Sequence, residues 1–215
     1  MNKVVCAIST HSSKLNIYMS DGYLNFSFSK EILNMEDVLF KEINNMLRNM
    51  NKRFRDISTI CIVRGPGRFT GIRLSYTFAS VLKSISKCKL YGVDVFDLLA
   101  YKFFINFPKE KNLCVVLRAF KNEYYYCTYK NKSMPVKSIN PKWVFENDLL
   151  DFIKKWEDAI ISDEEESRVY NMFKYKKLAP LKISNIRGED VLKSSLYFKN
   201  SNIKPIYLKP AKFEL

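Results

Sequence analysis

The chain has 215 residues, of which 47% are hydrophobic and 27% charged, and it carries a formal net charge of +14. This length is enough for one large or two small globular domains, and the lack of any run of 18 uncharged apolar residues excludes a membrane-spanning helix. The positive charge favours a polyanionic partner such as a nucleic acid, although lysines scattered over a solvated surface would give the same balance.

The cysteines and the histidine also narrow the class of protein. Five cysteines, an odd number, are scattered at positions 6, 61, 88, 114 and 127, and none forms a CxxC pair. This usage predicts reduced core thiols in a cytoplasmic protein, and the first residues predict a strand and not a signal peptide. The single histidine, His11, leaves almost no material for a zinc site, and we expect it on the surface of a turn.

The chain opens with a pattern that predicts three antiparallel strands. Residues 4–8 form an apolar run, and residues 15–19 and 24–28 alternate between apolar and polar side chains. Between the two alternating segments lies Asp21–Gly22, which is a strong hairpin signal.

A helix is predicted next, from Met35 to Met50, with Asn34 as its N-cap. Its methionine-rich apolar stripe has the spacing of one helix face, and Phe40 lies outside this stripe. Such a stripe is typical both of core packing and of an adaptable docking face, and one helix can have both.

Residues 60–86 predict a buried strand, a glycine-rich loop and a long helix. Glycines at this density allow positive φ angles or the close approach of another backbone, and proline fixes φ. A structural turn is favoured over a phosphate site, because the Gly-Lys-Ser/Thr ending of a P-loop is missing. Thr70 is predicted to cap the helix. The structural loop comprises Gly65, Pro66, Gly67, Arg68, Phe69, Thr70 and Gly71.

The predicted helix over residues 71–86 carries a stripe of apolar side chains and a separate row of small side chains. Leu74, Phe78, Leu82 and Ile85 form an apolar stripe at helical spacing. Gly71, Ser75 and Ala79 lie four residues apart, and small side chains at this spacing predict a flat face that a second helix can approach closely.

The remaining elements suggest a second half with a similar beginning. A strand at 89–93 and a helix ending before Pro108 are followed by a change in composition at 106–112, so we expect units of residues 1–108 and 109–215. The second unit is predicted to contain strands at 113–117 and 124–129, a third strand ending near 139, a helix from Pro141 to about Lys155, a strand at 159–162, a helix starting at 163–166 and a last helix after 187–190. This order predicts an α/β fold of mixed sheets with flanking helices in two halves.

The segment RGPGRFTGIRLSYTFASVLKSI closely resembles the signature of the TsaB (YeaZ) family, usually RGPGSFTG(L/V)R followed by a small-residue helix. Weaker matches keep the family's order: AIST at Ala7–Thr10, YGVDVFDLLAY at Tyr91–Tyr101, LRAFKNEYY at Leu117–Tyr125 and KPIYLKP at Lys204–Pro210. Members of this family have an actin-like (ASKHA) fold and are non-catalytic partners of the TsaD enzyme in tRNA threonylcarbamoyladenosine synthesis.

The resemblance implies a scaffold subunit that binds a TsaD-type transferase through its first two helices, and the same surface can make a homodimer. It also implies a TsaE-type ATPase as a further partner, with tRNA as the substrate of the complex. We expect no catalytic residue, no metal and no cofactor on this chain alone, with ATP only in the complex. Carried onto this chain, the partner-binding residues are Met35, Leu39, Ile43, Gly71, Ser75, Phe78, Ala79 and Leu82.

The chain departs from the family at several polar positions. Ser9 stands where actin-like ATPases have a magnesium-binding aspartate, which argues against kinase activity because a hydroxyl is a poor ligand for a hard dication. Arg68 replaces the loop serine and is either a new contact to an anionic group or a solvated side chain. The other departures are Met35 for a histidine, Arg118 for an aspartate and Phe120 for an arginine, whereas Glu123 and Tyr125 remain.

Two alternatives stay open at this point. A stand-alone actin-like nucleotide-binding protein would bind ATP by itself. A basic tRNA-binding module would show salt-sensitive affinity for tRNA, because phosphate contacts release counterions.

Overall fold

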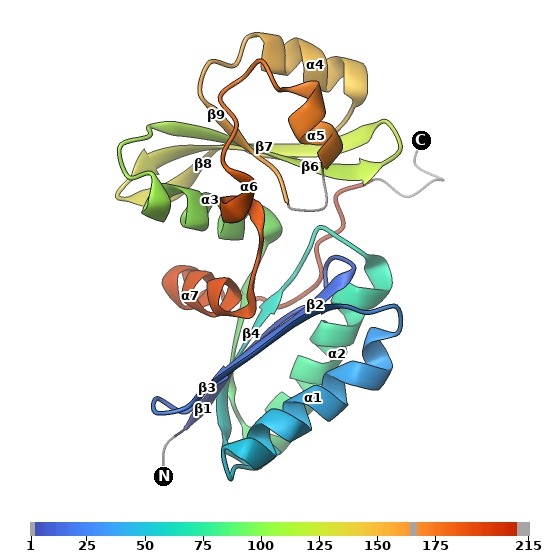
Figure 1. Ribbon diagram of the computed structural model, residues 1–215, viewed down its shortest axis with the longest axis vertical. Helices are drawn as coiled ribbons and strands as arrows, with labels where there is room; N and C mark the ends of the chain where they lie inside the picture. The colour runs from blue at the N-terminus through green and yellow to red at the C-terminus, as the bar shows by residue number, and fades with distance from the viewer. Residues whose placement is uncertain (1–2, 164–166, 210–215) are drawn as a thin grey trace. The chain divides into compact units, whose positions relative to one another are not determined.

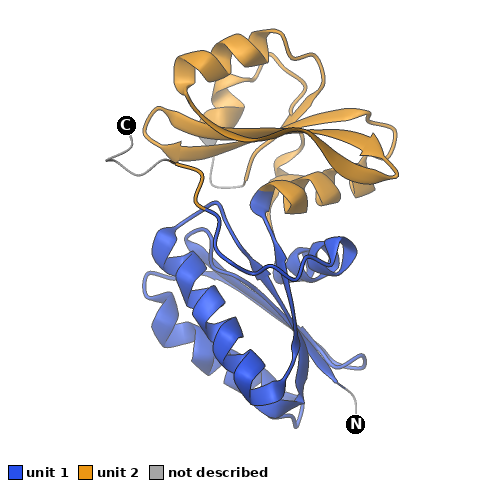
Figure 2. Cartoon of the chain, turned by 180° about the vertical axis from the view of Figure 1, so that it is seen from behind, with its two compact units in different colours: residues 1–95, 187–206 blue, residues 96–186, 207–215 orange. Residues whose placement is uncertain are grey.

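The computed structural model describes residues 3–163 and 167–209. The chain forms two compact units (Figure 2): unit 1 contains residues 1–95 and 187–206, and unit 2 contains residues 96–186 and 207–215. This division differs from the boundary near residue 108 expected from composition. The helix after residue 94 belongs to unit 2, where Asp97 accepts a hydrogen bond from Tyr129 (2.8 Å) and pairs with Lys137 (3.0 Å). The last helix returns to unit 1.

Unit 1 is built on a five-stranded mixed sheet in the order β3-β2-β1-β4-β5. The predicted meander is present: β1 pairs antiparallel with β2, and β2 with β3. β4 runs parallel to β1, and β5 runs parallel to β4. The strands are β1 (Val4–Ser9), β2 (Lys14–Ser20), β3 (Asn25–Glu31), β4 (Ile57–Val63) and β5 (Lys89–Val93).

Helices cover both faces of this sheet (Figure 1). α1 (Met35–Asn49) and α2 (Phe69–Ser86) lie on one face, and α7 (Gly188–Phe198) lies on the other, where it contacts every strand. A short 3-10 helix, η1 (Phe54–Asp56), precedes β4. Coverage on both faces explains why β1 and β4 read as continuous apolar runs.

The start of α2 differs from the prediction. The helix begins at Phe69, and Arg68 occupies the N-cap without a side-chain hydrogen bond to the helix. Thr70 therefore lies inside the first turn, so its predicted role as cap is wrong. Asn34 does occupy the N-cap of α1, but its side chain makes no capping hydrogen bond.

Unit 2 repeats the strand order of unit 1 on a smaller scale. Its sheet has the order β8-β7-β6-β9, in which β6, β7 and β8 form an antiparallel meander and β9 runs parallel to β6. The first four strands of unit 1 follow the same scheme, which confirms the predicted actin-like architecture of mixed sheets in two halves. The strands are β6 (Asn112–Phe120), β7 (Glu123–Lys132), β8 (Met134–Phe145) and β9 (Ala159–Ile161).

Within the described residues, four helices accompany this second sheet. They are α3 (Val95–Asn106), α4 (Glu146–Lys154), α5 (Ser167–Met172) and α6 (Leu181–Ser184). The helix predicted to start at residues 163–166 falls largely on residues 164–166, which lie outside the described residues. No helix in the described ranges combines the length and the apolar character that crossing a bilayer requires.

The prediction that Pro141 opens a helix is wrong. Pro141 lies within β8, and α4 starts five residues later, at Glu146. β8 is an edge strand of its sheet. Proline, which lacks a backbone N–H, is tolerated there because the outer side of an edge strand has no neighbouring strand to receive a hydrogen bond. The pairing register with β7 also shifts across this position, because Thr128 pairs with Ile139 and Tyr126 pairs with Lys142.

Candidate docking surface

The glycine-rich loop is fastened to the turn that follows β1. The backbone N–H of Arg68 donates to the carbonyl of His11 (2.7 Å), and the hydroxyl of Thr10 donates to the carbonyl of Gly71 (2.7 Å). A Cβ atom on Gly67 would overlap the carbonyl oxygen of His11, and one on Gly71 would overlap that of Thr10. The glycines are thus needed for a close backbone approach, as expected of a structural turn.

The same contacts bury His11, so its predicted surface position is wrong. The His11 side chain is only 5% exposed, and its Nδ1 lies 2.7 Å from the hydroxyl of Ser9, which is itself fully buried. Ser9 therefore bonds a neighbouring side chain. Because both side chains are enclosed, this serine–histidine pair is closed to a substrate and supports the turn.

Most of the side chains predicted to bind a partner lie inside unit 1. Phe78 is half-buried. The other seven are buried, and the apolar side chains among them pack with the sheet in the core of unit 1: Met35, Leu39, Ile43, Gly71, Ser75, Ala79 and Leu82. These residues support α1 and α2 from within. The small-residue row of α2 packs inward, with Gly71 against Thr10, and is not available to a helix of another protein.

A different set of side chains faces outward on α2. Phe69, Val81 and Ile85 are 56%, 53% and 62% exposed. With Arg73 and Thr77, which are also exposed, they follow one another at intervals of four residues. We call Phe69, Arg73, Thr77, Val81 and Ile85 the outer row of α2. Rows at this spacing form the ridges by which helices pack on one another.

The outer row begins beside a small pocket between the first turns of the two helices. The Arg73 guanidinium lies over the Phe69 ring, 4.9 Å from its centroid. The pocket brings the loop and both helix starts together and is lined by Leu33, Met35, Glu36, Arg68, Thr70, Gly71 and Leu74. Leu33 is among the most exposed large apolar side chains of the chain. The exposed Arg68, which replaces the family's serine, is thus positioned at the rim of the candidate docking surface.

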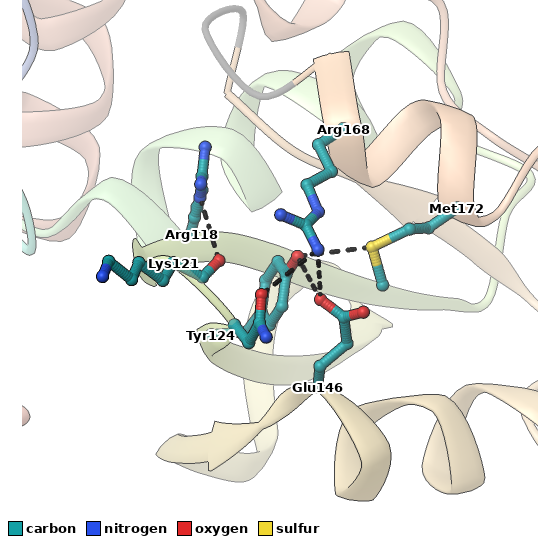
Figure 3. Close-up of polar contacts among 7 residues, drawn as sticks. Arg118, Lys121, Tyr124, Glu146, Arg168 and Met172 are labelled. Carbon is teal, nitrogen blue, oxygen red and sulfur yellow. Dashed lines mark hydrogen bonds and ion pairs between the residues drawn. The ribbon is translucent and has the colours of Figure 1, made fainter.

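The departures at Arg118 and Phe120 lie on the surface of unit 2. Arg118 is exposed, and its Nε donates to the carbonyl of Lys121 (3.3 Å) at the tip of the β6–β7 hairpin (Figure 3). Behind it, the buried Tyr124 donates to Glu146 (3.1 Å), and Glu146 also accepts a hydrogen bond from Arg168 (2.8 Å). This network stabilises unit 2 and leaves Arg118 outside it.

Glu123, one of the two retained family residues, holds the segment at Lys209. Its carboxylate oxygens lie 2.8 and 2.6 Å from the ammonium of Lys209 and accept a hydrogen bond from the Trp143 indole (3.2 Å). The ammonium also lies 5.9 Å from the ring centroids of Phe120 and Trp143. Sequence reasoning missed this contact, which joins positions 86 residues apart.

We expect Glu123→Gln to loosen the end of the chain at neutral pH. Hydrogen bonds from Lys209, and more weakly from Trp143, hold the pKa of Glu123 below its ordinary value. The pairing therefore stabilises the fold above the ordinary glutamate pKa and is lost as the pH falls through the lowered value. Hydrogen exchange of amides 206–209 should be faster in the variant at neutral pH, and the difference should disappear in acid.

The matched control for this experiment is Glu157→Gln, which removes an exposed carboxylate of the same unit. Equal exchange in wild type and Glu123→Gln at neutral pH would show that the Lys209 contact does not hold the chain end.

The cysteines have no features of a reactive site. All five are free and buried. Burial raises the pKa of Cys61 to about 12 and raises those of Cys6 and Cys114 as well, so these groups remain neutral thiols. Over residues 3–163 and 167–209, no three histidine, cysteine, aspartate or glutamate side chains gather as metal ligands would.

Comparisons with known proteins place this geometry in context. A family model described as TsaD, tRNA N6-adenosine threonylcarbamoyltransferase, matches residues 34–142, which is half of the chain. Two curated relatives are named tRNA threonylcarbamoyladenosine biosynthesis protein TsaB. The one from Buchnera aphidicola subsp. Schizaphis graminum is 25% identical over 130 residues, covering 60% of this chain and 61% of the relative.

The second TsaB relative, from Buchnera aphidicola subsp. Acyrthosiphon pisum, is 24% identical over 130 residues, covering 58% of each chain. The matches thus span about three fifths of the length of these relatives. Among solved structures, YeaZ from Pseudomonas aeruginosa superposes with a TM-score of 0.72 at 15% identity, covering 96% of this chain and 100% of that one. A further structure, described as similar to peptidase YeaZ from Pseudomonas aeruginosa, gives a TM-score of 0.74 at 14% identity with the same coverage.

Proposed function

Because this chain belongs to the TsaD family, as a divergent TsaB (YeaZ) member, we propose that it is a non-catalytic subunit that binds and activates a TsaD-type threonylcarbamoyl transferase. The process that it serves is the biosynthesis of tRNA threonylcarbamoyladenosine, as the names of its curated relatives state for those proteins. The partner surface consists of the outer row of α2 and the pocket beside its first turn.

The exposed apolar side chains on the outer row of α2 carry this proposal. Single exposed apolar residues are common on protein surfaces, but here Val81 and Ile85 are neighbours on one ridge and Phe69 begins the same ridge, so one partner can cover all three. α2 contains no acidic residue, whereas Arg73 and Lys83 add positive charge, so a partner helix with apolar and acidic side chains fits best. The same ridge can pair two copies of this chain when the transferase is absent.

We expect Val81→Arg and Ile85→Arg each to weaken the complex with the TsaD protein of the same genome by about 30-fold or more. Removing a central apolar contact and burying an unpaired charge typically costs about 2 kcal/mol or more. Size-exclusion chromatography with light scattering should show a heteromeric peak for the wild-type mixture. For either variant at the same concentration, this peak should be lost.

The matched control is Val136→Arg, which places the same charge at a valine of β8 that is 46% exposed. It should leave the complex intact, and far-UV circular dichroism should show all three variants folded. Normal complex formation by folded Val81→Arg and Ile85→Arg would refute the proposed surface.

We further propose that the chain acts in the cytoplasm and binds no nucleotide alone, with ATP and a TsaE-type ATPase entering only through the complex. The supporting observation is Ser9, whose buried hydroxyl lies against His11 at the position where an actin-like ATPase needs a metal-binding carboxylate. The same chromatography with ATP in the buffer tests this point. Retention of ATP by the isolated chain would contradict it.

A further inference from the structure

A second concave site lies at the far end of α1, away from the glycine-rich loop. It is formed by the last turns of α1, the residues that follow, and η1. We call it the basic pocket, and its lining residues are Asn44, Arg48, Asn51, Lys52, Arg53 and Phe54. Three of these side chains are cationic, two are amides and none is acidic.

The backbone around the basic pocket is ordered by its own hydrogen bonds. Asn51 adopts a positive φ of 53°, and its N–H donates to the carbonyl of Arg48 (2.9 Å). The N–H of Lys52 donates to the carbonyl of Leu47 (2.8 Å). These bonds satisfy carbonyls at the end of the helix, where a negative partial charge would otherwise repel an anion.

Two carboxylates close to the basic pocket accept hydrogen bonds from backbone groups. Asp56 accepts a hydrogen bond from the backbone N–H of Arg53 (2.8 Å). Backbone donation from Leu24 and Tyr23 holds the pKa of Asp21 below its ordinary value, and the charge of Lys52 contributes in the same direction. The lining itself holds three cationic side chains and no carboxylate, so it carries a net positive charge.

An exposed aromatic platform adjoins the basic pocket. Phe40 is 59% exposed and stacks on Phe54, with ring centroids 5.1 Å apart and planes 14° from parallel. Phe54 is partly buried against the core of unit 1 and lines the pocket. Phe40, Asn44 and Arg48 are four residues apart on α1, so the platform and the pocket share one side of the helix.

We propose that this site binds RNA, with a backbone phosphate in the basic pocket and a base stacked on Phe40. Cations that track a phosphate backbone next to an exposed aromatic ring are the usual elements of single-stranded nucleic-acid binding. The net charge of +14 supports a polyanionic ligand. This inference rests on the proposed function, because the RNA that such a subunit meets is the tRNA substrate.

The RNA site and the docking surface use different residues. The outer row belongs to α2, whereas the basic pocket belongs to the end of α1 and to η1. Substitutions in the basic pocket should therefore reduce RNA affinity without removing the heteromeric peak with TsaD.

We would measure binding of a fluorescently labelled tRNA transcript to the full chain by anisotropy at several KCl concentrations. The triple variant Arg48→Ala, Lys52→Ala, Arg53→Ala should bind roughly 30-fold more weakly, and its log Kd should depend less steeply on log salt by about 1 unit, the change for one lost phosphate contact. The control triple Lys111→Ala, Lys130→Ala, Lys132→Ala removes the same charge from exposed positions of unit 2. It should stay within about threefold of wild type, because those lysines lie outside the basic pocket.

Phe40→Ala should weaken tRNA binding roughly 10-fold with an unchanged salt slope, because stacking releases no counterions. Phe40→Tyr keeps the ring and should restore affinity.

Equal losses in the two triple variants would overturn the proposal in favour of diffuse charge attraction. It would also be overturned if the pocket triple lost the TsaD complex but kept its tRNA affinity, because the pocket would then serve an acidic protein surface. If the wild-type chain binds tRNA as described but never binds TsaD, the docking proposal fails and this one stands.

Discussion

Gly71→Ala is expected to lower the free energy of unfolding of unit 1 by about 3 kcal/mol, the upper end of the cost of forcing an extra methyl group into a packed site. The added Cβ would overlap the carbonyl oxygen of Thr10, a backbone atom that cannot rotate away. Either the turn after β1 or the start of α2 must move. That movement would also break the bond from the Thr10 hydroxyl to the Gly71 carbonyl. Urea unfolding followed by hydrogen exchange of amides in β1 and β4 measures the loss.

Gly22→Ala provides the control for backbone conformation. Gly22 has a φ of 94° in the β2–β3 hairpin, and an added Cβ would meet no atom within 4 Å. Its substitution should cost only about 1 kcal/mol, the usual penalty for an alanine in the left-handed region. If the two variants lose the same stability, the close approach of the loop to Thr10 has no energetic importance.

Ala79→Arg is expected to prevent unit 1 from folding. Ala79 is fully buried in the core cluster of unit 1, among side chains of the sheet and of α1. A guanidinium there would have to be buried without a partner or would displace α2, which typically costs more than about 4 kcal/mol. We expect insoluble protein, or soluble protein that lacks a cooperative thermal transition in circular dichroism.

Val81→Arg is the matched control, because it puts the same side chain two residues further along α2, on the exposed row. It should melt within a few degrees of wild type. A folded Ala79→Arg protein with wild-type melting would contradict the core position of Ala79. Loss of TsaD binding by an unfolded Ala79→Arg variant would reveal nothing about the interface, so this substitution, the natural choice from sequence alone, is a poor test.

The fold was largely predictable because its signals are local. The first hairpin, for example, is predictable from nearby residues alone: apolar and polar side chains alternate at 15–19 and 24–28, and the Asp21–Gly22 turn lies between them. The wrong prediction for Pro141 has a related cause, because a proline can open a helix or lie in an edge strand. The choice between a helix start and an edge strand depends on whether another strand pairs on the outer side of this segment. The local sequence pattern does not contain that information.

The exposed residues of α2 that we propose for docking are harder to predict, because periodicity does not distinguish the two sides of a helix that both carry apolar residues. Their spacing puts Leu82 and Ile85 in one stripe, yet Leu82 is buried and Ile85 is among the exposed side chains. The position of Phe40 outside the stripe of α1 was the one sequence signal of an outward-facing aromatic. Long-range partners such as Lys209 and Glu123 leave no such signal at all.

The return of α7 to unit 1 has a consequence for how the protein is made. Residues 96–186 are contiguous and contain the complete sheet of unit 2, whereas the sheet of unit 1 is covered on one face by a helix encoded after residue 187. During synthesis on a ribosome, the N-terminal strands emerge first, but α7, the helix that packs on one face of their sheet, is translated much later. The face of the first sheet that α7 covers is therefore exposed to chaperones until residue 198 has been translated, whereas all four strands of the second sheet have emerged once residue 161 is made.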